Sequence, residues 1–178
     1  MLLRSAPRCA MRQRHLLLCC ALALAGATTA SAQTEHHVCR LLKPDEVKAL
    51  LGPTIVLANV IEEGPERSVC QYEDAKAPVF ILTVYWKGGR NQWNASTAAL
   101  KAGDRMLAGS EGIGIDRLAK AGVVKAGPVQ GLGDAAYFSD LLPSLVLKGD
   151  VLLELNMALV KDPERTFRPL AEKLLTRI

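Results

Sequence analysis

The chain has 178 residues, 49% of them apolar, and its 22 Lys and Arg against 18 Asp and Glu give a formal charge of +4. This length suits one domain rather than two, and the apolar fraction excludes an intrinsically disordered chain. A positive charge suits a nucleic acid or a membrane surface, so the position of the charge along the chain matters.

Residues 1–32 have the pattern of a cleaved secretory signal peptide. Four arginines precede an apolar run over residues 16–26, and Ala30-Ser31-Ala32 follows as an A-x-A cleavage site. The apolar run is well short of the roughly 20 residues that a membrane-spanning helix needs. Met1 and Met11 both remain candidate start sites.

Removal of this segment changes the charge and the cysteine count. It leaves 18 basic residues against 18 acidic ones, so no basic excess remains to attract a nucleic acid. Cys39 and Cys70 are then the only cysteines, and an even number in an exported chain predicts a disulfide. The alternative is two free thiols with a redox or metal role, but the chain has no C-x-x-C motif.

The first half of the mature chain predicts a helix followed by three strands. Residues 33–43 are expected to form a flexible N-terminal segment. Residues 44–52 begin with Pro and two acids, which suit the first turn of a helix, and end on Gly. Apolar and β-branched segments then predict strands at 54–62, 68–73 and 79–86, the last apolar on both faces like a central strand.

The second half predicts the same order of elements. A second helix is expected over 91–107, followed by a Gly-rich segment, 108–128, that holds a possible short helix at 116–121. Strands are expected at 135–139, 145–147 and 151–157, the last two joined by a tight Lys148-Gly149-Asp150 turn. Asp162-Pro163 then begins a helix whose apolar stripe reaches Ile178.

These elements predict a single α+β domain over residues 44–178. The order is helix, three strands, helix, three strands, helix. The links between strands are too short for parallel crossovers, so we expect one mainly antiparallel sheet of about six strands with the helices packed on one face.

A series of short motifs runs through this order: Cys39-Arg40-Leu41-Leu42-Lys43-Pro44-Asp45-Glu46-Val47, Leu51-Gly52, Cys70-Gln71-Tyr72, Gly131-Leu132-Gly133-Asp134-Ala135-Ala136 and Leu145-Val146-Leu147-Lys148-Gly149-Asp150. In these motifs the chain resembles a loose group of uncharacterised bacterial envelope proteins, which includes lipoproteins with domains of unknown function. The resemblance implies a small envelope-facing domain and brings no activity. The chain differs from the lipoproteins because Leu18 precedes Cys19 and apolar residues follow Cys20, so no lipid anchor is implied.

Histidine-based catalysis inside the domain is excluded by position. His36 and His37 are the only histidines of the mature chain, and both lie near its N-terminus, so no Ser-His-Asp or Cys-His set is available. The pair is a weak candidate for copper binding, against the ordinary interpretation of an exposed tail. We predict no metal and no cofactor, because the chain also lacks a P-loop, an H-E-x-x-H motif and a dinucleotide-binding glycine pattern.

Carboxylate chemistry remains open. Asp134, Asp150 and Glu73 would suffice for glycoside hydrolysis if two of them met in space. The simpler interpretation is that the two aspartates bind backbone N–H groups in their own turns.

The sequence therefore predicts a non-catalytic binding domain that is periplasmic or secreted by a bacterium. The partner is either an envelope protein or a small ligand or glycan, and a carboxylate-based hydrolase is the third hypothesis. A ligand surface would use aromatic side chains and one turn carboxylate, although the same aromatics also suit a core. The candidates are Trp86, Trp93, Tyr137 and Asp134.

Overall fold

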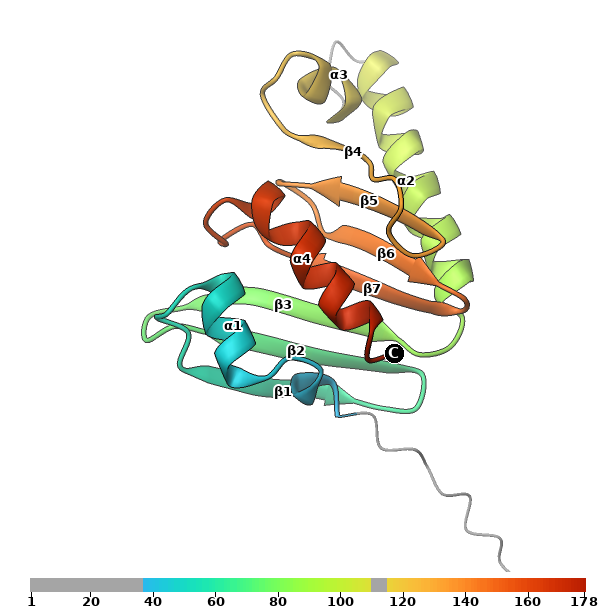
Figure 1. Ribbon diagram of the computed structural model, residues 1–178. Coiled ribbons are helices and arrows are strands. Elements are labelled where there is room, and N and C mark those ends of the chain that lie inside the picture. Colours follow the sequence, from blue (N-terminus) through green and yellow to red (C-terminus); the bar gives the residue numbers. More distant parts are fainter. Residues whose placement is uncertain (1–36, 110–114) are drawn as a thin grey trace, which may run out of the picture. The chain divides into compact units, whose positions relative to one another are not determined.

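The computed structural model describes residues 37–109 and 115–178, which belong to one compact unit, Thr34–Ile178. A seven-stranded antiparallel sheet in the order β1-β2-β3-β7-β6-β5-β4 forms its centre (Figure 1). The α+β class and the antiparallel sheet are confirmed, with one strand more than the six expected. The predicted signal peptide, residues 1–32, lies outside the described residues.

The elements follow the expected order. The first half contains a short 3-10 helix, one α-helix and three strands: η1 (Val38–Arg40), α1 (Pro44–Leu51), β1 (Leu57–Glu63), β2 (Arg67–Glu73) and β3 (Pro78–Tyr85). The second half contains α2 (Gly89–Gly109), α3 (Ile115–Lys120), β4 (Ala126–Pro128), β5 (Ala135–Ser139), β6 (Ser144–Lys148), β7 (Val151–Asn156) and α4 (Pro163–Leu175). The additional strand, β4, comes from the Gly-rich segment in which no strand was expected.

Two three-stranded meanders, β1-β2-β3 and β5-β6-β7, meet through their last strands. β3 pairs with β7 in antiparallel register from Ile81 opposite Asn156 to Tyr85 opposite Leu152. β3 is thus an interior strand of the sheet, and its Phe80, Leu82 and Val84 are buried. The two-sided apolar character of this segment did indicate an interior strand.

The helices α1 and α4 cover one face of the sheet, where the larger core lies (Figure 1). The apolar stripe of α4 is buried there as its periodicity predicts. The largest side chains of this core include Tyr72, Phe80, Leu82, Leu153, Leu155, Phe167, Leu170 and Leu174.

The expectation that all helices pack on one face is wrong for α2. Trp93 of α2 packs with Leu145, Leu147 and Leu152, which alternate along β6 and β7 with residues of the larger core. Because successive side chains of a strand point to opposite faces, α2 must lie on the other face of the sheet. The physical reason is that β6 is apolar on both faces, so each face needs a cover.

The expected flexible segment, 33–43, is partly a structured region. Val38 of η1 and Leu42 are buried in the larger core, so the packed domain begins before Pro44. Within residues 37–109 and 115–178, no helix has both the length and the apolar character to cross a bilayer.

Candidate ligand-binding site

Two of the carboxylates that the sequence suggested, Asp134 and Asp150, lie at one corner of the domain, where three turns meet. Asp134 accepts a hydrogen bond from the Gly149 N–H at 2.8 Å. Asp150 accepts hydrogen bonds from the N–H groups of Gly88 at 2.8 Å and Arg90 at 3.3 Å. These backbone donors hold the pKa of Asp150 below its ordinary value. Both aspartates bind backbone N–H groups, as expected, but the expectation that these groups belong to their own turns is wrong, because the donors lie in neighbouring turns 15 and about 60 residues away along the chain.

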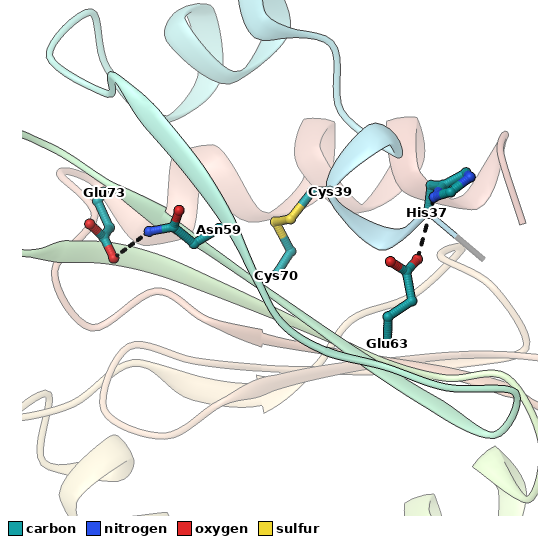
Figure 2. Close-up of a disulfide and its surroundings, with 6 residues drawn as sticks. All are labelled: His37, Cys39, Asn59, Glu63, Cys70 and Glu73. Atoms are coloured by element: carbon teal, nitrogen blue, oxygen red, sulfur yellow. Dashed lines mark hydrogen bonds and ion pairs between the residues drawn. A yellow bond between two sulfur atoms is a disulfide. The ribbon is translucent and has the colours of Figure 1, made fainter. Parts of the chain in front are cut away.

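Glu73 lies far from this corner. It is the last residue of β2, beside the start of β3, and it accepts hydrogen bonds from Asn59 at 3.1 Å (Figure 2) and Gln71 at 2.5 Å. Asp150 instead bonds to Gly88, beyond the other end of β3. An eight-residue strand such as β3 is about 26 Å long. Glu73 therefore does not join Asp134 and Asp150, and each of these two carboxylates is held by backbone N–H groups.

The sheet separates the aromatic candidates. Trp86 packs against the larger core, and its indole N–H donates to the Ser68 hydroxyl at 2.9 Å. Trp93 and Tyr137 lie on the opposite face with α2, and Asp134 is an exposed turn residue. The four residues do not form one ligand surface, and none of them lines the three cavities described below.

The N-terminal histidines are only partly within the structure. His37 Nδ1 lies 3.7 Å from the Glu63 carboxylate (Figure 2), while His36 lies outside the described residues. No group of three or more His, Cys, Asp or Glu side chains in the described ranges is arranged to hold a metal ion.

The predicted disulfide between Cys39 and Cys70 is confirmed (Figure 2). It joins η1 to β2 across a sequence separation of 31 residues, with 5.2 Å between the Cα atoms. The chain-entropy model assigns a loop of this size about 3.7 kcal/mol. The disulfide holds η1 against the sheet, and η1 in turn forms part of a cavity.

The cavity of about 480 Å³ opens beside the disulfide, between α1 and the edge of the sheet. Its lining comes from η1, α1, residues 55–58 and Tyr72 of β2. Leu42, Val47 and Ile55 supply buried apolar wall, and Val56 remains 70% exposed. Sequence reasoning missed this site; the one signal was the apolar segment at residues 55–57, at the start of the strand expected over 54–62.

Three cations line the same cavity, and no acidic residue does. Arg40, Lys43 and Lys48 form no ion pair with any residue that the structure describes. Asp45 does not line the cavity. The positive charge of the cavity is therefore not neutralised by its own lining.

Glu46, the other acid of α1, is engaged elsewhere. It receives two hydrogen bonds from the Arg177 guanidinium, at 2.6 and 2.7 Å, and one each from the Lys173 ammonium and the Lys43 N–H. The Arg177 hydrogen bonds, followed by that of the Lys43 N–H, hold the pKa of Glu46 far below its ordinary value.

Tyr72 adds a buried polar group to the cavity wall. Its ring stacks at a tilt on Phe80, with 5.4 Å between centroids, and its hydroxyl is buried without a hydrogen-bond partner among the described residues. Burial raises the pKa of Tyr72, so the phenol stays neutral.

Two other cavities differ in their charges. One of about 510 Å³ lies between the α3–β4 segment and α4. Its cations are already paired: Lys125 with Glu164, and Arg168 with Glu172 at 3.5 Å. One of about 400 Å³ separates the C-terminal end of α1 from the first turns of α4. The α1–β1 cavity thus differs from the cavity between the α3–β4 segment and α4, because its own cations form no ion pairs with described residues.

Comparison of the chain with protein-family models, curated proteins and solved structures finds no match.

Proposed function

We propose that the chain is an exported, non-catalytic binding domain of the bacterial envelope, and that the α1–β1 cavity holds a small apolar ligand. The cavity itself carries the proposal. Its volume of about 480 Å³ falls within the roughly 300–1,000 Å³ typical of ligand pockets, and its walls are mainly apolar. This favours a small ligand over an envelope protein as the partner.

A binding role agrees with how the carboxylates are used. Asp134 and Asp150 accept hydrogen bonds from backbone N–H groups, and Glu73 accepts side-chain amides at a distant end of the sheet. A hydrolase needs an acid and a base on either side of one substrate bond.

Export is supported by the signal-peptide pattern and by the disulfide, which persists in oxidising compartments. Expression of the full chain in a bacterium and sequencing of the purified N-terminus would test this. We expect a chain that begins at Gln33, recovered from the periplasm or the medium with no free thiol. An unprocessed, reduced chain in the cytoplasm would overturn the proposal of export.

Ligand binding can be tested with the neutral fluorescent probe N-phenyl-1-naphthylamine, titrated into the processed protein. Wild type is expected to bind it saturably at one site. Ala58→Phe, on β1 in the cavity lining, should lose binding because the ring fills the cavity. Ala121→Phe adds the same ring at an exposed site outside that lining and should bind normally. Absent binding in wild type, or equal binding in Ala58→Phe, contradicts the proposal.

A further inference from the structure

We infer that the ligand of the α1–β1 cavity is a single-chain anionic amphiphile, such as a medium-chain alkyl carboxylate. Its head group would lie among Arg40, Lys43 and Lys48, and its alkyl chain against the apolar wall. This inference rests on the proposed function and adds the chemical class of the ligand.

The charge of the cavity is the first argument. Although the mature chain is expected to be neutral overall, three cations gather in this lining and none has an acidic partner in the described part of the chain. Lys43, at the N-cap of α1, and Lys48, within α1, both line the cavity together with Pro44 and Val47 between them. An anionic head group would complement this local charge.

The apolar lining is the second argument. Val56 and Leu57 are 70% and 49% exposed although they adjoin the buried Ile55. An alkyl chain in the cavity would cover apolar surface of this kind, at about 25 cal/mol for each Å² removed from water. A small inorganic anion would leave that surface uncovered.

The size of the cavity separates one alkyl chain from two. The volume of about 480 Å³ corresponds to about 16 non-hydrogen atoms of a ligand, if each takes about the 30 Å³ that a water molecule occupies in the liquid. A single chain of ten to twelve carbons with its head group fits this volume, whereas a two-chain phospholipid does not.

The test compares three ligands with the same ten-carbon chain on the processed protein: decanoate, decanol and decyltrimethylammonium. Each displaces N-phenyl-1-naphthylamine in turn at constant ionic strength. We expect decanoate to displace the probe at a concentration about tenfold lower than decanol, with the cation weakest. The preference should shrink as salt rises from 50 to 500 mM, because exposed charges are screened.

The matched variants separate the charge of this cavity from the charge of the whole molecule. In Arg40→Gln/Lys43→Gln/Lys48→Gln, the preference for decanoate over decanol, measured as the ratio of the two displacement concentrations, should disappear. Lys76→Gln/Lys87→Gln/Lys120→Gln removes three charges from exposed residues outside the lining and should keep the preference.

The outcomes distinguish this inference from the proposed function. Equal displacement by decanoate and decanol, or an unchanged preference in the cavity variant, would contradict the inference that the ligand is anionic. The proposed function, binding of a small apolar ligand, would remain. If the probe itself does not bind, the proposed function fails, and the inference fails with it.

Discussion

Glu46 is the residue through which α1 and α4 are tied together. It accepts hydrogen bonds from Arg177 and Lys173, and Arg177 also donates to the Leu41 carbonyl oxygen just before α1. The same carboxylate binds the Lys43 N–H and so caps the first turn of α1. One ionised side chain therefore positions the helix that carries two of the three cavity cations.

We expect the contribution of Glu46 to stability to depend on pH. Its pKa in the folded chain lies below the ordinary 4.5, so its ionised form stabilises the fold fully above that value. This stabilisation is lost as the pH falls below about 4.5, because the unfolded chain then binds the proton more readily. In urea unfolding from pH 7 to pH 3, the difference between wild type and Glu46→Gln should therefore shrink toward acid.

The neighbouring Asp45→Asn variant provides the control for that titration. Asp45 is exposed and forms no ion pair with a described residue, so Asp45→Asn should keep the wild-type pH profile. A difference between wild type and Glu46→Gln that does not change with pH would contradict the prediction.

Tyr72→Phe should stabilise the ligand-free protein by about 1 kcal/mol, because it removes a buried hydroxyl that has no partner. Tyr85→Phe is the comparison, since the Tyr85 hydroxyl donates to Glu154 at 3.4 Å and its removal should bring no such gain. Urea midpoints of both variants against wild type measure the effect. A lower midpoint for Tyr72→Phe would show that the hydroxyl does bond to another group.

At the scale of elements, the three-turn corner explains why the motifs around Asp134 and Asp150 contain so many glycines. Gly133 has a positive φ of 61°, and a Cβ there would lie 2.4 Å from the Leu147 carbonyl oxygen. Lys148 of the adjoining turn donates to the carbonyl oxygens of Leu175 and Ile178, at the end of α4. These motifs thus join the β5, β6 and β7 meander to its neighbours.

Two glycine substitutions separate backbone strain from the steric clash. Gly131 has a similar φ of 70° but open space around its missing Cβ. Gly131→Ala should cost about 1 kcal/mol for the left-handed conformation alone, and Gly133→Ala about 1–3 kcal/mol more because the corner must shift. Thermal unfolding of the two variants measures the difference, and equal losses would contradict the role of the close contact.

The two edge strands of the sheet each have features that discourage pairing with another chain. β1 carries a bulge between Val60 and Glu62 and two acids at its end, while β4 has only three residues. Bulges, charges and short strands all discourage pairing with another chain. The exposed apolar residues near β1 are therefore better suited to a small ligand than to an added strand.

At the scale of the whole domain, two apolar cores of unequal size lie on the two faces of the sheet. The larger one joins α1 and α4 to β2, β3, β5, β6 and β7, whereas the smaller one lies under α2. Stability should therefore depend mainly on the α4 face.

Leu174→Ala tests this dependence, since Leu174 is fully buried in the larger core. We expect a loss of about 2–5 kcal/mol in the free energy of unfolding, measured in urea. Leu159→Ala removes the same atoms from a residue that is 69% exposed and should cost less than about 0.5 kcal/mol. Similar losses in the two variants would contradict a core centred on α4.

The periodicity of apolar residues predicted most helices and strands, because it is a local pattern that can be read over a few turns or residues of one element. The apolar stripe of α4 reflects one buried face. Periodicity failed for β4, because a strand of three residues is too short to show a pattern. It also failed for the expected ligand surface, since Trp86 and Tyr137 lie on opposite faces through a register that their spacing does not encode.

The amino-acid sequence alone specifies the order of most helices and strands and the Cys39–Cys70 pair. These depend on the cysteine count and on short-range periodicity, both of which can be read along the chain. Only the tertiary structure decides which face α2 covers and where a cavity opens beside Arg40, Lys43 and Lys48. Both depend on strand register and on the space left between packed elements, which no local pattern records.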